Sequence, residues 1–359
     1  MKKLFEHFDK QSKRSLLIRS YLSALLIFLT DLATGSELSL LVLYMFPISI
    51  TSWFVNKKHG LIIAAFCAFA NIINSQFAIH SQNLFIYPNI ITIWNSLQLL
   101  IIFLAFGFMI STLKSIQIAK SNNEVILAQK VQKFLLPQSK PIMKNFEYAG
   151  SKKSFNNFSG DFFDYILLDE NKLMLIIGDI CGSGISAALL MAHIHGIIRS
   201  KNHQTDNLTE LMNTINRSLH SSTDDDKFAT LFIGVYDGEN RTLTFVNAGH
   251  TPPLVLRSHK IIKLYNEGFI LGINQDIVYS SSMLELEKGD LLFFYTDGLT
   301  ESRNHQKEFY GEDRLIKHIY SKIKSTPQEI SESIYQDIEK FNGLEPQQDD
   351  MTMIVGKVS

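Results

Sequence analysis

The sequence predicts two parts of different fold class, an N-terminal all-α membrane bundle of four helices and a soluble α+β domain. Between His59 and Leu113 there is no Asp, Glu, Lys or Arg, whereas from Lys114 onward charges recur every few residues. Beyond Pro137, short β-rich runs and helical patterns come in blocks, which favours α+β layers over a doubly wound parallel sheet. A chain of 359 residues is long enough for both parts.

The overall composition excludes several classes of partner and site. Lys and Arg together number 34 against 35 Asp and Glu, so the chain lacks the positive excess with which proteins neutralise nucleic-acid phosphates. The two cysteines, Cys67 and Cys181, stand far apart and without metal-ligand spacing. We therefore expect no nucleic-acid partner, no disulfide framework and no zinc site.

Four apolar segments are candidates for helices that span a membrane, because about 20 mostly apolar residues are needed to cross a bilayer core. Within residues 1–113 they are Ile18 to Ala33, Leu38 to Val55, Leu61 to Ala78 and Ile90 to Leu113. The first is the weakest, since Arg19 and Asp31 confine its uncharged stretch.

The distribution of basic residues predicts the orientation of these spans. With four spans, the basic N-terminus, Lys57 and Lys58, and Lys114 and Lys120 all fall on one side. The positive-inside rule then places both termini in the cytoplasm. We expect a multi-pass protein of the inner (cytoplasmic) membrane, in contact with membrane lipid, whose C-terminal domain is cytoplasmic. A cleaved signal peptide fits poorly, because three further apolar spans follow.

A helical linker is predicted over residues 114–136. The segment Ser115 to Leu136 is rich in Lys, Gln, Asn and Ala, lacks Gly and Pro, and ends at Pro137. Its apolar positions cover only two heptads, too few to establish a coiled coil. A homodimer formed through this helix and a solvated spacer helix therefore both stay open.

The soluble domain, residues 137–359, shows strand and helix patterns in blocks. Predicted strands are Lys172 to Ile180, Ala229 to Asp237, Thr242 to Asn247, Leu291 to Thr296 and Met351 to Val358. Predicted helices are Ile185 to Arg199, Leu208 to His220, Asp313 to Lys322 and Gln328 to Phe341.

Four acidic motifs stand beside these strands or turns. They are SGDFFD (Ser159 to Asp164), IGDICGSG (Ile177 to Gly184), YTDGLTE (Tyr295 to Glu301) and QDDMT (Gln348 to Thr352). Each alone is usually only a turn. Jointly they supply carboxylates without a neighbouring Lys or Arg, which suits hard cations such as Mg²⁺ or Mn²⁺. Two such ions can activate water for displacement at phosphorus.

In this order the motifs resemble the sporulation stage II protein E (SpoIIE) branch of the metal-dependent PPM, or protein phosphatase 2C-like, superfamily. Supporting stretches are VQKFLLP (Val131 to Pro137), AALLMA (Ala187 to Ala192), FATLFIGVYD (Phe228 to Asp237), NAGHTPPLVL (Asn247 to Leu256), LGI (Leu271 to Ile273) and FYGEDRL (Phe309 to Leu315). Together they cover nearly all of residues 128–358.

The resemblance implies a β-sandwich flanked by helices that holds two divalent ions, Mn²⁺ or Mg²⁺. It implies a serine/threonine phosphatase that hydrolyses phosphoserine or phosphothreonine with metal-activated water. A phosphorylated regulatory protein is the implied substrate and partner, for example an anti-sigma-factor antagonist.

Site residues carry over motif by motif from this resemblance. Asp179 resembles the carboxylate that bridges both ions, and the carbonyl of Ile180 falls where the family uses a backbone ligand. Asp161 resembles a ligand of one ion, and Asp297 and Asp349 resemble ligands of the other. Asp179 and Asp297 are the predicted catalytic residues. Asp164 and Asp350, which lie close to these positions in sequence, rank second.

Two departures from the family pattern leave the carboxylates in place. Ser159 precedes Gly160 where two glycines are usual, and Cys181 replaces a small Ser or Ala. Cys181 also stands near the position of a candidate acid in eukaryotic relatives, so the general acid is unassigned. We interpret His250 as structural, because a lone His in a turn more often is.

Two rival functions fit the sequence less well than a phosphatase. A non-catalytic, membrane-linked scaffold that binds a phosphoprotein has no evident need for four metal-ligand positions. A nucleotide cyclase or phosphodiesterase would share at most the SGDFFD loop, and the sequence has no P-loop.

Overall fold

The chain divides into two compact units, Met1–Ile126 and Leu127–Ser359. In this computed structural model the described residues are 7–9, 11–34, 40–81, 90–137, 139–182, 184–201, 207–223, 227–266 and 268–359. The division falls inside one helix, α5 (Ile90–Leu135), and within the predicted linker 114–136.

The N-terminal unit consists of packed helices. They are α2 (Lys13–Thr34), the 3-10 turn η2 (Leu41–Tyr44), α3 (Met45–Ile50), the π-helical turn η3 (Thr51–Val55), α4 (Lys57–Ser81) and α5. Ala24, Tyr44 and Phe103 belong to one buried cluster that joins these helices. Gly60 permits close contact, since a Cβ there would lie 2.2 Å from Ser52 Oγ. Small residues at helix contacts are typical of membrane bundles.

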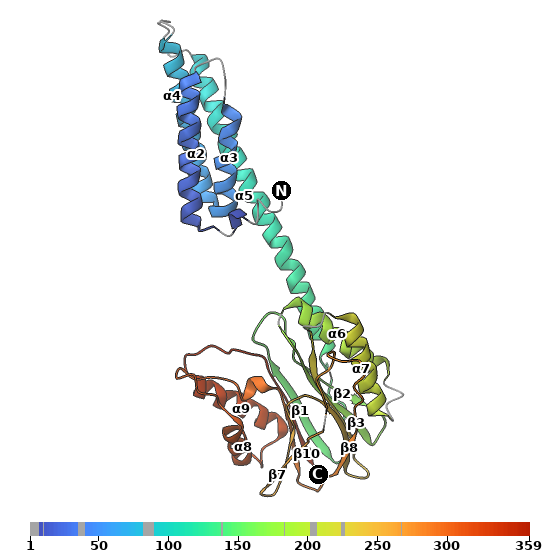
Figure 1. Ribbon diagram of the computed structural model, residues 1–359. Coiled ribbons are helices and arrows are strands. Elements are labelled where there is room, and N and C mark those ends of the chain that lie inside the picture. Colours follow the sequence, from blue (N-terminus) through green and yellow to red (C-terminus); the bar gives the residue numbers. More distant parts are fainter. Residues whose placement is uncertain are drawn as a thin grey trace. The chain divides into compact units, whose positions relative to one another are not determined.

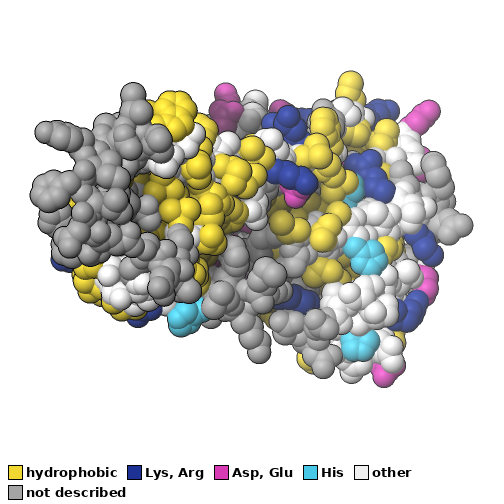
Figure 2. Space-filling view, turned by 90° about the horizontal axis from the view of Figure 1, so that it is seen from above, with side chains coloured by type: hydrophobic (Ala, Val, Ile, Leu, Met, Phe, Trp, Pro, Cys, Tyr) yellow, Lys and Arg dark blue, Asp and Glu magenta, His cyan; other side chains and the backbone are white. Residues whose placement is uncertain are grey.

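Two of the described helices are long and apolar enough to cross a membrane, Lys13–Thr34 and Trp94–Leu135. Their outer surfaces carry exposed apolar side chains such as Leu26 and Ile101. Figure 2 shows hydrophobic side chains gathered in one region of the visible face. The helical stretch Leu41–Val55 is too short for this test, because extended backbone at Asn56 ends it. The predicted span from Leu38 begins outside the described residues. The helical character of this unit is thus confirmed, two helices meet the test over the described residues, and the four-span bundle stays a prediction.

The C-terminal unit contains two five-stranded sheets whose neighbouring strands all pair antiparallel. One has the order β1 (Phe146–Lys153), β10 (Met351–Val358), β9 (Leu291–Tyr295), β6 (Leu254–Arg257) and β7 (Lys260–Lys263). The other has the order β2 (Phe162–Leu167), β3 (Lys172–Ile180), β4 (Ala229–Asp237), β5 (Thr242–Ala248) and β8 (Ser282–Glu285). Helices α6 (Ile185–Ser200), α7 (Leu208–Ser222), α8 (Glu312–Ser321) and α9 (Pro327–Asn342) complete the unit.

Strands in the middle of these sheets are buried on both faces. Along β3, Leu175 and Ile177 belong to the core between the sheets, whereas Ile176 belongs to the core beneath α6 and α7. Along β10, Ile354 faces the other sheet and Val355 packs against α8 and α9. Because successive side chains of a strand point to opposite faces, continuous apolar runs fill both layers.

The result is a four-layer domain in which α6 and α7 cover one sheet and α8 and α9 cover the other (Figure 1). The β-sandwich flanked by helices that was expected from the sequence is confirmed. Its two sheets bring distant chain segments to the same end of the sandwich.

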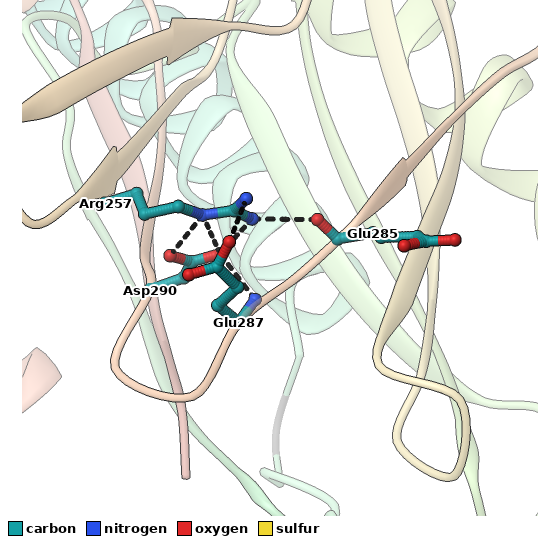
Figure 3. Close-up of polar contacts among 4 residues, drawn as sticks. All are labelled: Arg257, Glu285, Glu287 and Asp290. Atoms are coloured by element: carbon teal, nitrogen blue, oxygen red, sulfur yellow. Dashed lines mark hydrogen bonds and ion pairs between the residues drawn. The ribbon is translucent and has the colours of Figure 1, made fainter.

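An ion-pair network near the start of β9 connects the end of β6 to the segment between β8 and β9. Arg257 Nε lies 2.9 Å from Asp290 Oδ1, and its Nη1 lies 2.7 Å from Glu287 Oε1 (Figure 3). Its Nη2 donates to the carbonyl of Glu285 at 2.8 Å. Asp290 is buried, so the bidentate contact compensates a charge that would otherwise be costly. Asp290 precedes β9 and Asp297 follows it, which separates this network from the acidic motifs.

Candidate active site

The first two acidic motifs meet at the end of the β2–β3 pair. Phe162 pairs with Gly178, so the next positions along the two strands, Asp161 and Asp179, are cross-strand neighbours. Gly160 makes the approach possible: a Cβ there would lie 2.5 Å from the carbonyl oxygen of Ile180 and 3.2 Å from Asp179 Oδ1. The structure therefore brings together the three predicted positions of these motifs.

The other two acidic motifs meet on the opposite sheet. Asp297 opens the turn η4 (Asp297–Leu299) two residues after β9 ends, and Asp349 lies two residues before β10 begins. A Cβ at Gly298 would lie 1.9 Å from the carbonyl oxygen of Asp350 and 3.4 Å from Asp349 Cβ. Only glycine fits this approach, which explains its place after Asp297.

One threonine joins the two halves of the site. Thr296 Oγ1 donates to Asp161 Oδ2 at 2.7 Å and accepts the amide of Thr352 at 3.0 Å. Thr296 directly follows β9 in one sheet, whereas Asp161 directly precedes β2 in the other. Both side chains are buried. The contact thus fixes the carboxylate of Asp161 relative to the end of the opposite sheet.

The carboxylates influence one another's protonation. Burial raises the pKa of Asp161 and of Asp179, the latter to about 6, and the two also act on each other. Burial followed by the charge of Glu301 raises the pKa of Asp297. Burial followed by the charges of Asp297 and Asp350 raises the pKa of Asp349. Such crowding of acids is a feature of functional sites and favours the binding of a cation.

The donor set has the chemistry that Mg²⁺ or Mn²⁺ requires, namely carboxylate and carbonyl oxygens. Across the described ranges, no group of three or more His, Cys, Asp or Glu side chains lies close enough together to enclose an ion as it stands. The oxygens accept other hydrogen bonds instead: Asp350 Oδ1 accepts the amide of Phe155 at 2.7 Å, and Asp349 Oδ1 accepts the amide of Asp350 at 2.8 Å. Ion binding therefore requires side-chain rotation that exchanges these contacts.

Asp164 lies apart from this cluster and has a structural partner. Its carboxylate accepts hydrogen bonds from Arg199 Nε and Nη2 at 2.8 and 2.7 Å, and lies 2.9 Å from His195 Nε2. Both partners belong to α6, so the buried Asp164 fastens β2 to that helix. Its second rank as a candidate ligand was wrong, because side chains three positions apart along this strand point to opposite faces.

The sequence reasoning missed Lys152. Its Nζ donates to the carbonyl oxygen of Asp161 at 2.6 Å. Burial lowers the pKa of Lys152, whereas the charges of Asp161, Asp350 and Asp179 act to raise it. The acidic cluster thus has a basic neighbour, which corrects the expectation of a site free of Lys and Arg. Lys152 belongs to β1, a strand that the sequence analysis did not identify.

His250 is structural, as the sequence analysis interpreted it. Its Nδ1 lies 2.9 Å from Thr230 Oγ1, and its backbone amide donates to Asn247 Oδ1 at 2.7 Å. Burial lowers the pKa of His250 to about 4, so the imidazole is neutral at pH 7. A neutral, buried imidazole is a poor proton donor, and this site still has no assigned general acid.

The end of α5 holds the loop that leads to Asp161. Gln132 Nε2 donates to the carbonyl oxygen of Ser159 at 2.7 Å, and Gln129 Nε2 donates to that of Asn157 at 2.9 Å. Leu135 packs against the core beneath α6 and α7. All these contacts lie within the C-terminal unit.

Comparison with known families decides the relationship of the chain. A family model described as Stage II sporulation protein E (SpoIIE) matches residues 169–359, more than half of the chain. The chain belongs to the SpoIIE family. The matched segment contains Asp179, Asp297 and Asp349, whereas Asp161 precedes it.

Curated relatives of this SpoIIE-family chain include phosphatases. It is 29% identical over 246 residues to the phosphoserine phosphatase RsbU of Bacillus subtilis, covering 68% of this chain and 72% of that protein. It is 28% identical over 259 residues to the protein IcfG of Synechocystis, covering 64% of this chain and 41% of that protein. The chain thus spans less than half the length of IcfG.

Solved structures confirm the fold of the C-terminal unit. The SiaA-PP2C domain of Pseudomonas aeruginosa superposes with a TM-score of 0.61 at 17% identity, covering 67% of this SpoIIE-family chain and 98% of that domain. A structure of the PP2C phosphatase domain of SpoIIE from Bacillus subtilis, with a fragment of its regulatory domain, gives a TM-score of 0.52 at 21% identity. It covers 61% of this chain and 64% of that one. The sandwich is therefore a PP2C-type fold.

Proposed function

We propose that this chain is a membrane-anchored, metal-dependent protein serine/threonine phosphatase. The observation that carries the proposal is the meeting of Asp161 and Asp179 from one sheet with Asp297 and Asp349 from the other, at one end of a PP2C-type sandwich. If this cluster served only core packing, apolar residues would serve that purpose better. Its raised carboxyl pKa values favour a cation as its natural occupant.

Each residue has a distinct part in this proposal. Asp179 would bridge two divalent ions, Mn²⁺ or Mg²⁺, with Asp161 and the carbonyl of Ile180 on one side. Asp297 and Asp349 would hold the second ion. When bound, such ions supply an activated water and neutralise charge on the phosphoryl group. Thr296 keeps Asp161 aimed at the site through its 2.7 Å hydrogen bond.

The proposed location is the inner membrane, with the phosphatase unit in the cytoplasm. Two helices of sufficient length and apolarity, Lys13–Thr34 and Trp94–Leu135, support the anchor. Basic residues near the N-terminus and after Leu113 support cytoplasmic termini. We retain four spans as the proposed number, because Lys57 and Lys58 then also lie on the cytoplasmic side.

The proposed substrate is a phosphoserine or phosphothreonine of a regulatory protein. The name of the relative RsbU, a phosphoserine phosphatase, supports serine phosphate as the reacting group. An anti-sigma-factor antagonist is the example that the family resemblance provides. This regulatory protein is a separate molecule in the proposal.

A hydrolysis assay on the full-length chain in detergent micelles tests the proposal. The purified protein should hydrolyse p-nitrophenyl phosphate with Mn²⁺ or Mg²⁺, and should then release phosphate from serine-phosphorylated candidate proteins. Ethylenediaminetetraacetate should stop both reactions. Undiminished turnover in the chelator would contradict metal dependence, and tight binding of a phosphoprotein without any turnover would favour the scaffold alternative.

A further inference from the structure

Lys152 stands where the interior of the sandwich opens onto the acidic cluster. Phe146 and Tyr148, at alternate positions of the same strand, belong to the core between the sheets. Lys152 continues this alternation and pairs with Thr352 of β10. Its Nζ reaches the carbonyl oxygen of Asp161 at 2.6 Å. A lysine thus occupies an inward-facing position that apolar residues hold elsewhere on β1.

The neighbouring lysine shows the contrast. Lys153 points to the opposite face of β1 and pairs with Glu339 of α9. That pair is largely exposed, whereas Lys152 is attracted by Asp161, Asp350 and Asp179 together. The two side chains have the same composition and adjacent positions, but only one is directed at the site.

We propose that Lys152 is the internal counter-cation of the acidic site, where its ammonium group offsets carboxylate repulsion before a metal binds and thereby sets the affinity for divalent cations. This inference rests on the proposed metal-dependent function. Clustered carboxylates that are buried or partly buried are costly unless a positive charge compensates them. The same ammonium repels an incoming dication, so the site binds metal less tightly than its carboxylates alone would allow.

Metal titration of the full-length chain tests this role. Protein in detergent is stripped with chelator, dialysed, and titrated with Mn²⁺ in a calorimeter, and thermal unfolding is recorded without metal. Lys152→Gln retains an N–H donor for Asp161 but removes the charge. It should bind Mn²⁺ about tenfold more tightly, an order expected for one unit charge acting on a dication. Its metal-free Tm should fall, and Mn²⁺ should raise that Tm more than in the wild type.

Two further variants separate charge from position. Lys152→Arg keeps the charge and should bind Mn²⁺ within about threefold of the wild type, a difference of less than 1 kcal/mol. Lys153→Gln is the matched control and should leave the Mn²⁺ affinity unchanged. If Lys152→Gln folds only with Mn²⁺ present, that requirement supports the counter-cation role. If Lys152→Gln does not fold at all, Lys152→Arg decides: a Mn²⁺ affinity that differs from the wild type by more than about threefold overturns the inference.

The remaining outcomes distinguish this inference from the function beneath it. If folded Lys152→Gln binds Mn²⁺ with the same affinity as the wild type or more weakly, the counter-cation role is overturned. The proposed function is not affected by that result as long as the wild-type protein binds Mn²⁺. Unchanged Mn²⁺ affinity together with weaker inhibition by orthophosphate would make Lys152 a phosphate ligand instead. A wild-type protein that binds no Mn²⁺ would overturn both proposals.

Discussion

Thr296 and Asp161 lie 135 positions apart in sequence, and their side chains are joined by a 2.7 Å hydrogen bond at the end of the sandwich. Thr296 also accepts the amide of Thr352, so the same hydroxyl is held by its own sheet while it donates to the other. Both groups are buried, which makes this hydrogen bond costly to remove. The geometry of the acidic cluster therefore depends on a residue that carries no charge.

Thr296→Val tests this dependence. Valine has nearly the same shape but neither donates to Asp161 nor accepts from Thr352. We expect the loss of about 1 to 3 kcal/mol of stability and a Mn²⁺ affinity lower by about tenfold to a hundredfold, as for other groups that orient metal ligands. Calorimetric titration and thermal unfolding measure the two effects. Thr242→Val, at the start of β5, is the control, and a Thr296→Val protein with wild-type metal affinity would contradict the role.

Removing either predicted catalytic carboxylate should abolish most turnover. Asp179→Ala and Asp297→Ala each remove a proposed ligand while also relieving repulsion between buried acids, so the domain should stay folded. Phosphate release should fall by at least about a hundredfold, as expected when metal activation of water is lost. Circular dichroism checks folding. Near-native rates in a folded Asp179→Ala protein would refute the assignment.

The metal-stripped protein should become less stable as pH rises through the titration of Asp179. Burial and then the charge of Asp297 raise the pKa of Asp179 from 3.8 to about 6. The folded state thus holds this proton more tightly than the unfolded state, and the stabilisation is complete below pH 3.8 and lost as pH rises through about 6. The shift corresponds to up to about 3 kcal/mol. Thermal unfolding of the metal-stripped protein, recorded as a function of pH, measures this loss of stability. Asp179→Asn cannot ionise at this position, so the stability of this variant should fall less steeply as pH rises. Parallel stability profiles for the variant and the wild type would contradict the assignment.

Much of the fold could be predicted because its central strands are long and apolar. The predicted strands Lys172 to Ile180, Ala229 to Asp237 and Met351 to Val358 are confirmed to the residue. The short strands β6, β7 and β8 were missed, and so were β1 and β2. β1 contains Gly150 and ends in two lysines, and β2 has Asp164 inside it, so neither shows a clean apolar pattern. Pairing with neighbouring strands, rather than local propensity, makes these segments extended.

The acidic motifs could be found from sequence because three of them combine an aspartate with a glycine beside a strand, and the fourth places two aspartates directly before one. Lys152 could not, since it lies outside all four motifs, and Thr296, although it lies within YTDGLTE, carries no charge that marks it as a site residue. They are brought to it by strand pairing across many residues, Lys152 through β10 and Thr296 through its contact with Asp161. Asp164 was misplaced for the opposite reason: it is near Asp161 in sequence and directed elsewhere in space.

Cysteine labelling can decide between two and four membrane spans. With four spans, Lys58 lies on the cytoplasmic side; with only Lys13–Thr34 and Trp94–Leu135 as spans, it lies on the other side. We expect Lys58→Cys, in a background without Cys67 and Cys181, to react with an impermeant maleimide only from the cytoplasmic face. A cysteine placed at Ser359 reports the cytoplasmic side in both cases and serves as the control. Labelling of residue 58 from outside alone would contradict four spans.

The proposed membrane module is expected to control the phosphatase through α5 rather than serve only as an anchor. The helix has no Pro or Gly between Ser115 and Leu135, and its last turns hold the loop before Asp161 through Gln132 and Gln129. Rotation of this helix would therefore move the loop that positions a proposed metal ligand. Inserting one to four alanines between Ala119 and Val125 rotates the end of the helix by about 100° per residue. Phosphatase activity in vesicles should then vary with helical phase rather than with length.

Control depends on a signal that binds two states of the module unequally, because equal affinity shifts no equilibrium. A flexible Gly-Ser segment in place of residues 119–125 should uncouple activity from the signal while leaving p-nitrophenyl phosphate hydrolysis intact. Gln132→Ala should weaken the response in the same way, since it releases the carbonyl of Ser159, whereas Lys130→Ala on the exposed side of the helix is the matched control. If all insertions, the Gly-Ser segment and Gln132→Ala leave the response of the native protein to its signal unchanged, the helix is a tether.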